Sequence, residues 1–200
     1  SKIKDQILSI GEVLSAKLLT AILLKNGVTA RFADSRELIK TDSKFGDAQP
    51  IEQASKKNVI QYFKENEDAV NIVTGFIASN AKNVTTTLGR NGSNYTASLI
   101  ANYLNAEELQ NYTHVDGIYT ANPDLVPDAK KIDYLTFNEA NELANFGATI
   151  LHAKTIIPLL EKNIPLRILN TFNHENKGTL IRSTASKEGI KTLSVLENVA

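Results

Sequence analysis

Short strand-like segments alternate with helical segments along the 200 residues of this chain, and this alternation constrains its fold more than any other feature. Residues 2–25 and 51–65 have the apolar periodicity of helices, whereas 28–33 and 69–74 are short apolar runs typical of strands, the second of them buried. The alternation continues with helices to about residue 105, over 137–146 and over 155–162, and with strands near 108–115, 164–169 and 178–181. Parallel strands joined by helices form crossover units whose helices cover the sheet. We therefore predict the α/β class, as a three-layer α/β/α sandwich with a mainly parallel central sheet.

The first helical segment, residues 2–25, places six large apolar residues on one stripe. They are Ile3, Ile7, Ile10, Leu14, Leu18 and Ile22. Asn26-Gly27 supplies the signal that ends this helix. No window of the chain approaches the roughly 18 apolar residues that a membrane span needs, so we expect no membrane contact.

Charge and composition exclude several classes of site. The chain has 22 basic and 22 acidic residues, a balance that argues against non-specific binding of nucleic acid. It has no cysteine, which excludes disulfides and thiolate metal sites and fits a cytoplasmic protein. Its three histidines lack the carboxylate spacing of a ligand set, so we predict no protein-held metal and a packing or hydrogen-bonding role for His152.

A glycine-rich turn over residues 85–97 carries the strongest chemical signal. Gly89 and Gly92 flank Arg90, and Ser93 follows as the expected N-cap of a helix. The free N–H groups at a helix start attract anions, and an arginine fork fits a carboxylate or a phosphate. The turn lacks the third glycine of a dinucleotide site and the lysine of a nucleotide P-loop. It therefore predicts capture of a small anionic substrate.

Further motifs occur in a fixed order over residues 5–182. They are 9–15 (Ser-Ile-Gly-Glu-Val-Leu-Ser), 74–77 (Thr-Gly-Phe-Ile), 85–93 (Thr-Thr-Thr-Leu-Gly-Arg-Asn-Gly-Ser), 115–120 (Val-Asp-Gly-Ile-Tyr-Thr), 127–132 (Pro-Asp-Ala-Lys-Lys-Ile), 146–148 with 151–152, and 177–181 (Lys-Gly-Thr-Leu-Ile). In this order they resemble the aspartate kinases of the amino-acid-kinase superfamily. Asn91 in the glycine turn is most similar to kinases fused to homoserine dehydrogenase.

This resemblance implies transfer of the γ-phosphoryl group of ATP to the side-chain carboxylate of L-aspartate, the first step toward lysine, threonine and methionine. By position, Glu12 would pair with the substrate ammonium group, and Ser93 would contact the substrate. Arg90 would clamp a substrate carboxylate and is the expected catalytic residue. Mg²⁺ would be held chiefly by ATP oxygens and water.

The resemblance also implies a nucleotide site in the second half of the chain. Its expected residues are Thr113, His114, Asp116, Gly117, Tyr119, Asp124 and Thr149. Three of these depart from the family pattern, because His114 replaces an aspartate, Asp124 an arginine and Thr149 a lysine. Asn94 likewise replaces an aspartate. Loss of two cations beside a polyphosphate is expected to weaken nucleotide binding.

The family's first-strand motif, Lys-Phe-Gly-Gly, is absent, and Lys44-Phe45-Gly46-Asp47 is not its equivalent. We predict that residues 1–182 form the C-terminal part of a kinase catalytic domain. Residues 183–200 would be a linker and the first strand of an ACT-type regulatory domain. The chain alone would be inactive, and the full protein bifunctional and homo-oligomeric. A kinase of another carboxylate or carbamate, and a non-catalytic nucleotide-binding relative, remain open alternatives.

Overall fold

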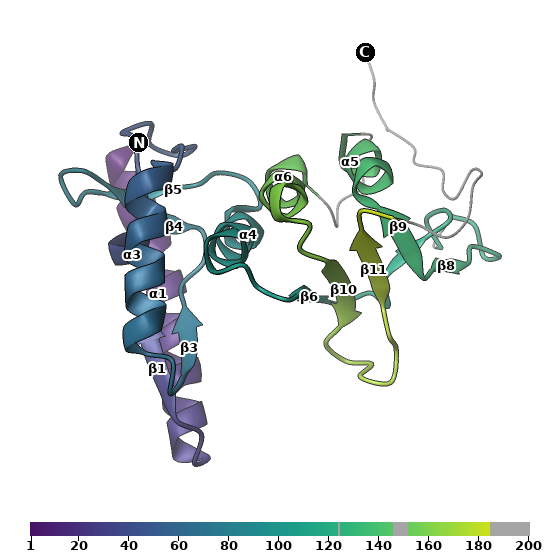
Figure 1. Cartoon of the computed structure of the whole chain (residues 1–200), viewed down its shortest axis with the longest axis horizontal. Helices are drawn as coiled ribbons and strands as arrows, with labels where there is room; N and C mark the ends of the chain where they lie inside the picture. The colour runs from purple at the N-terminus through teal and green to yellow at the C-terminus, as the bar shows by residue number, and fades with distance from the viewer. Residues whose placement is uncertain (124, 146–151, 185–200) are drawn as a thin grey trace. The chain divides into compact units, whose positions relative to one another are not determined.

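The computed structural model describes residues 1–123, 125–145 and 152–184, and it has the mixed helices and strands of an α/β protein (Figure 1). Two compact units make up the chain, Ser1–Leu104 and Asn105–Ala200. Both consist of short strands with helices packed beside them. The linker and opening strand are predicted over residues 183–200, of which 185–200 lie outside the described residues.

The first unit begins with the longest helix and ends with the helix that follows the glycine-rich turn. Its elements are α1 (Lys2–Lys25), β1 (Ala30–Ala33), α2 (Ser35–Leu38), β2 (Lys40–Thr41), α3 (Glu52–Glu65), β3 (Val70–Val73), β4 (Ile77–Asn80), β5 (Thr85–Thr87) and α4 (Gly92–Leu104). Strand β1 pairs in parallel with β3, while β4 lies between β2, which is parallel to it, and β5, which is antiparallel. A buried apolar cluster that includes Ile39, Val59, Leu88 and Leu99 fills the interior. Leu88 therefore anchors the chain just before the turn at Arg90.

Helix α1 turns its small and polar side toward the strands. It contacts β1, β3, β4 and β5, and its buried residues are Asp5, Ser9, Ala16 and Thr20. The apolar stripe predicted from the sequence lies on the opposite side of the helix and is exposed in this structure. Its residues are Ile3, Ile7, Ile10, Leu14, Leu18 and Ile22. Periodicity thus located the helix, but the residues that pack inward are its small ones.

The same helix is long and apolar enough to cross a membrane by length and composition alone. The prediction that no segment approaches such a span was therefore wrong. Length and composition do not distinguish a membrane-spanning helix from an apolar helix that packs inside a protein. One side of α1 packs against four strands.

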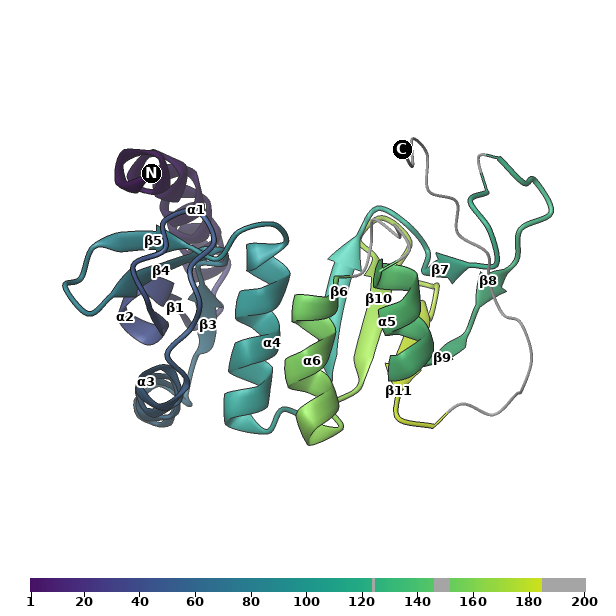
Figure 2. The same cartoon turned by 90° about the horizontal axis from the view of Figure 1, so that it is seen from above.

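The second unit contains β6 to β11 and two helices. Its elements are β6 (Leu109–Thr113), β7 (Ile118–Tyr119), β8 (Lys131–Ile132), β9 (Tyr134–Thr136), α5 (Phe137–Asn145), α6 (Ala153–Lys162), β10 (Leu166–Asn170) and β11 (Thr179–Arg182). The main sheet has the order β6-β10-β11-β9, in which only the β10–β11 pair is antiparallel. Figure 2 shows α5 and α6 on one side of this sheet. Leu135, Leu159, Leu166 and Ile168 are fully buried between these layers.

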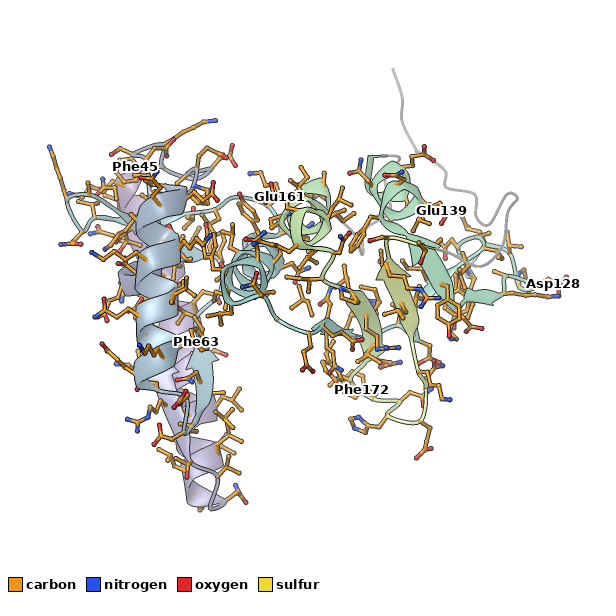
Figure 3. All side chains as sticks on the ribbon, viewed as in Figure 1. Phe45, Phe63, Asp128, Glu139, Glu161 and Phe172 are labelled. Carbon is orange, nitrogen blue, oxygen red and sulfur yellow. The ribbon has the colours of Figure 1, made fainter. Side chains whose placement is uncertain are left out.

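The connection between β10 and β11 projects from the sheet, and Phe172 at its start is largely exposed (Figure 3). Strands β7 and β8 form a separate antiparallel pair.

The predicted helices and most predicted strands are confirmed within a few residues. Pairing is divided among four small sheets. The short elements that were not predicted as such are α2, β2, β4, β5, β7, β8 and β9. Strand β3 is only partly buried, which corrects the expectation for residues 69–74, because β1 is its one pairing partner among the described strands.

Candidate functional site

The turn between β5 and α4 presents Arg90 to solvent. Gly89 and Asn91 adopt positive φ angles of 79° and 57°, and the N–H of Gly92 donates to the Gly89 carbonyl oxygen at 3.1 Å. Arg90 sits at the tip of this turn and is exposed. Its guanidinium makes no hydrogen bond or ion pair with any residue that the structure describes. A permanently charged fork is thus available for an anionic ligand.

Ser93 is not the N-cap that the sequence predicted. Helix α4 already begins at Gly92, so Ser93 is its second residue and lies exposed on the first turn. The helix starts two residues earlier than expected, because Asn91, with its left-handed backbone, ends the turn directly before Gly92. Ser93 remains beside Arg90 at the start of the helix, where backbone N–H groups lack helical partners.

Gly75 fits tightly against this first turn. A Cβ atom at Gly75 would lie 2.7 Å from the Cβ of Ser93 and 2.8 Å from its Oγ. The next residue, Phe76, donates its N–H to Thr96 Oγ1 at 3.1 Å, and that hydroxyl donates to the Gly92 carbonyl oxygen at 3.0 Å. The loop after β3 is therefore docked on the start of α4, and it sets the surroundings of Ser93.

Glu12 lies on the strand-facing side of α1. It follows Ser9 by three residues and precedes Ala16 by four, and both of these are buried against the strands. Glu12 itself is half-buried, and within residues 1–123, 125–145 and 152–184 its carboxylate has no hydrogen bond or ion pair. This position does not fit an ordinary surface glutamate whose carboxylate points fully into solvent. The carboxylate can accept a ligand's ammonium group instead.

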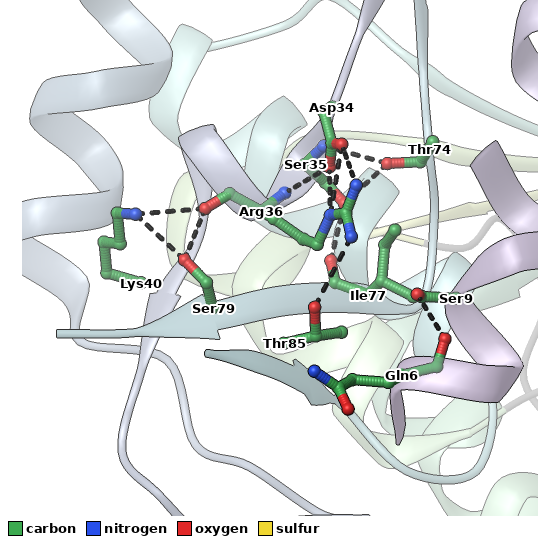
Figure 4. Close-up of polar contacts among 10 residues, drawn as sticks. All are labelled: Gln6, Ser9, Asp34, Ser35, Arg36, Lys40, Thr74, Ile77, Ser79 and Thr85. Carbon is green, nitrogen blue, oxygen red and sulfur yellow. Dashed lines mark hydrogen bonds and ion pairs between the residues drawn. The ribbon is translucent and has the colours of Figure 1, made fainter. Parts of the chain in front are cut away.

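A polar network connects α2 with Thr74 after β3 and with the strands β4 and β5 (Figure 4). The Ser35 N–H donates to Thr74 Oγ1 at 2.8 Å, and the Ser35 hydroxyl donates to the Ile77 carbonyl oxygen at 2.5 Å. Lys40 Nζ and Ser79 Oγ both donate to the Arg36 carbonyl oxygen, at 3.1 Å and 2.5 Å. These bonds hold both ends of the Gly75 loop, which follows Thr74 and precedes Ile77.

Arg36 also forms an ion pair with Asp34 and reaches Thr85 Oγ1 on β5 at 3.4 Å. Burial by itself raises the pKa of Asp34, but the hydrogen bonds and charge of Arg36 outweigh it. The pKa of Asp34 therefore lies below its usual value of 3.8.

We expect Asp34→Asn to lower the free energy of unfolding by about 1 kcal/mol at pH 7, because asparagine keeps the cap of α2 but loses the charge. Because the pKa of Asp34 is lower in the folded state than in the unfolded state, its ionised carboxylate stabilises the fold at any pH above the unfolded-state pKa. This stabilisation is lost as the pH falls through the folded-state pKa. Urea unfolding at neutral and at acidic pH measures the difference. Asp68→Asn, which alters the exposed Arg31–Asp68 pair, is the control and should change little. A difference that persists unchanged below the folded pKa would refute this account of Asp34.

In the second unit, predicted nucleotide residues gather where β6 ends. Thr113 is the last residue of β6 and lies opposite Asn170 of β10, and its hydroxyl is 3.4 Å from Nδ1 of the exposed His114. Asp116 accepts hydrogen bonds from Asn170 Nδ2 at 2.7 Å and from Asn173 Nδ2 at 3.0 and 3.1 Å. Sequence reasoning missed these two asparagines, although the Asn-rich run after β10 was a signal. They orient the Asp116 carboxylate.

Gly117 and Tyr119 lie on the adjoining hairpin. Gly117 has a φ of 137°, and a Cβ there would lie 2.5 Å from Thr179 Oγ1. That hydroxyl accepts from the Ile118 N–H at 2.8 Å and donates to the Ile132 carbonyl oxygen at 2.6 Å. Tyr119 is half-buried on β7. The structure thus brings Thr113, His114, Asp116, Gly117 and Tyr119 into one region of this unit.

The remaining predicted residues differ in outcome. Asp124 and Thr149 lie outside the described residues. His152 caps α6, where its Nδ1 accepts from the Lys154 N–H at 3.2 Å, so its predicted hydrogen-bonding role is confirmed.

Comparison with known proteins gives matches that span both units. The amino acid kinase family model matches residues 1–170. Lysine-sensitive aspartokinase 3 of Escherichia coli is 39% identical over 178 residues, which are 88% of this chain and 40% of that protein. A chloroplastic bifunctional aspartokinase/homoserine dehydrogenase 1 of Arabidopsis thaliana is 37% identical, over 94% of this chain and 21% of that protein.

Solved structures give the same result. The crystal structure of E. coli aspartokinase III in complex with aspartate and ADP matches with a TM-score of 0.88 and 37% identity, over 92% of this chain and 42% of that one. The Clostridium acetobutylicum aspartate kinase structure matches with a TM-score of 0.79 and 32% identity, over 92% of this chain and 40% of that one. The chain spans about two fifths of these kinases. With its α/β fold, its Arg90 turn and this family match, the chain belongs to the amino acid kinase family.

Proposed function

We propose that the protein containing these residues is an aspartate kinase, which transfers the γ-phosphoryl group of ATP to the side-chain carboxylate of L-aspartate. One observation carries the proposal: an exposed arginine, unpaired among the described residues, at the glycine turn that opens α4. The names of the relatives support it, as does the E. coli structure described with aspartate and ADP.

In this proposal the first unit binds the amino acid. L-Aspartate offers one ammonium group and two carboxylates, so its site needs an acid and a cationic fork. Glu12 would accept from the ammonium group, Arg90 would hold a carboxylate and limit charge build-up during transfer, and Ser93 would contact the substrate. Glu12 and Arg90 both retain free charged groups within the part of the chain that the structure describes.

The second unit would bind ATP, through Thr113, His114, Asp116, Gly117 and Tyr119. Tyr119 has an aromatic face suited to stacking on a base, and the carboxylate of Asp116 is already oriented by two asparagine amides. Asp124 and Thr149 would adjoin the nucleotide as well. Mg²⁺ would arrive with ATP and neutralise phosphate charge, since ATP oxygens and water are its usual ligands.

We further propose that residues 1–182 are part of a larger catalytic domain and that 183–200 lead into an ACT-type regulatory domain. The exposed apolar side of α1 supports the first statement, because contiguous apolar surface of this kind is usually covered. We also propose that the complete protein is a cytoplasmic homo-oligomer that is fused to homoserine dehydrogenase. It would act at the start of lysine, threonine and methionine synthesis. The Arabidopsis and maize relatives with such a fusion support that part.

Activity assays of two polypeptides test the function. The complete natural protein should release ADP when given ATP, Mg²⁺ and L-aspartate, and much less with glutamate or carbamate. The 200-residue chain alone should show no turnover above background, because it spans about two fifths of its kinase relatives. If the complete protein releases ADP faster with glutamate or carbamate than with L-aspartate, that acceptor is its substrate and the aspartate assignment is wrong. Binding of ATP and aspartate in calorimetry without turnover by the complete protein would identify a non-catalytic relative.

A further inference from the structure

Asp5, in the first turn of α1, is a fully buried carboxylate. Its Oδ2 accepts hydrogen bonds from the Gly46 N–H at 2.9 Å and from the Thr87 N–H at 3.0 Å. Its Oδ1 is also buried and has no hydrogen-bond partner among the described residues. A buried carboxylate is costly unless hydrogen bonds compensate for lost water, so this one must hold its two donors firmly.

The two donors belong to segments that are far apart in the sequence and meet next to the Arg90 turn. Gly46 lies in the polar loop of residues 42–50, and Thr87 is the last residue of β5. Within this contact the Ala48 N–H donates to the Thr87 carbonyl oxygen at 2.9 Å. A Cβ at Gly89 would lie 2.7 Å from Asp47 Oδ1, so the loop also packs directly against the turn.

Asp5 and Glu12 belong to the same helix, α1, which fixes their relative positions. The two residues are seven positions apart on one helix, which places them on the same side and about 10 Å apart along its axis. On the other side of the contact, only two residues separate Thr87 from Arg90. One buried side chain therefore joins the helix that carries Glu12 to the strand end that carries Arg90.

We propose that Asp5 is a positioning residue for the amino-acid substrate: it sets Glu12 and Arg90 at the separation that one amino acid can bridge. This inference rests on the proposed function, in which these two residues bind aspartate. Asp5 does not touch the substrate. It acts through the backbone of Thr87, three positions before Arg90.

Steady-state kinetics of the complete natural protein test the inference. Asp5→Ala leaves two N–H groups without their acceptor, and we expect the KM for aspartate to rise about tenfold or more. The KM for ATP should stay within about twofold, because the nucleotide residues belong to the other unit. Asp5→Asn can still accept both bonds through its neutral amide oxygen, although more weakly, so the aspartate KM should rise only about threefold.

Asp42→Ala is the matched control. Asp42 Oδ1 also accepts two backbone N–H bonds, from Lys44 at 3.0 Å and Gln49 at 3.1 Å, but both lie in its own loop. This variant should change the aspartate KM by less than about twofold. Hydrogen exchange adds a direct readout, because Asp5→Ala should speed exchange of the Thr87 N–H and Asp42→Ala should not.

The outcomes separate the two proposals. If the wild-type protein neither binds nor phosphorylates aspartate, the proposed function fails, and this inference fails with it. If the wild type is active and both Asp5 variants keep its aspartate KM, only the positioning role is overturned. An equal rise in both KM values would also overturn it, as that result indicates general destabilisation. Should Asp5→Ala fail to fold, the Asp5→Asn protein still decides: an unchanged aspartate KM, or Thr87 exchange no faster than in the wild type, contradicts the inference.

Discussion

Gly178→Ala is expected to unfold the second unit, with a loss of more than about 4 kcal/mol. Gly178 has a φ of 69°, and a Cβ there would lie only 1.9 Å from the Ile168 carbonyl oxygen and 3.0 Å from its carbonyl carbon. Both of these neighbours are backbone atoms of β10, fixed by pairing with β6 and β11. No side-chain rotation relieves the overlap, so β10 and β11 must separate.

Urea unfolding of the 200-residue chain, followed by far-UV circular dichroism, measures this loss, and hydrogen exchange locates it. Protection should disappear after residue 105. Gly11→Ala is the matched control, because a Cβ at Gly11 meets nothing within 4 Å and the helix favours alanine by about 1 kcal/mol. A Gly178→Ala protein that unfolds at the same urea concentration as the wild type would show that β10 and β11 do not approach this closely.

Arg90→Ala is expected to lower kcat/KM for aspartate by about a hundredfold or more in the complete protein. The substitution removes the one charged residue within the turn segment 88–93. Arg90→Lys should recover only part of the activity, since an ammonium group cannot make the bidentate pair of hydrogen bonds that a guanidinium makes with a carboxylate. The KM for ATP should change much less than the value for aspartate.

Arg31→Ala is the control for this experiment. Arg31 is also exposed, in β1 of the same unit, but it is paired with Asp68 at 3.1 Å, and such surface pairs contribute little. Activity should be close to that of the wild type. Equal activity of the Arg90→Ala and Arg31→Ala proteins would remove Arg90 from the substrate site.

Much of this architecture could be predicted because local sequence determines it. The apolar periodicity of residues 2–25 gave α1, and the paired glycines with Arg90 gave the turn before α4. Periodicity does not tell which side of a helix is covered, however. The stripe headed by Ile3 is exposed, while Ser9 and Ala16 pack inward.

Contacts between distant segments were beyond prediction. Asp5 meets Thr87 across 82 residues, and Asp116 meets Asn170 across 54, and no local pattern marks either pair. Strand β4 was missed because its sequence, Ile-Ala-Ser-Asn, lacks apolar alternation and gains its burial from neighbouring strands. The position of Ser93 depended on a single left-handed residue, Asn91.

A crystal structure of the complete protein with L-aspartate and ADP tests the central claim most directly. We predict that the Arg90 guanidinium will contact a carboxylate of the amino acid and the Glu12 carboxylate its ammonium group, with ADP beside Thr113 and Tyr119. Aspartate bound away from Glu12 and Arg90, or an empty turn at a saturating aspartate concentration, would contradict the account.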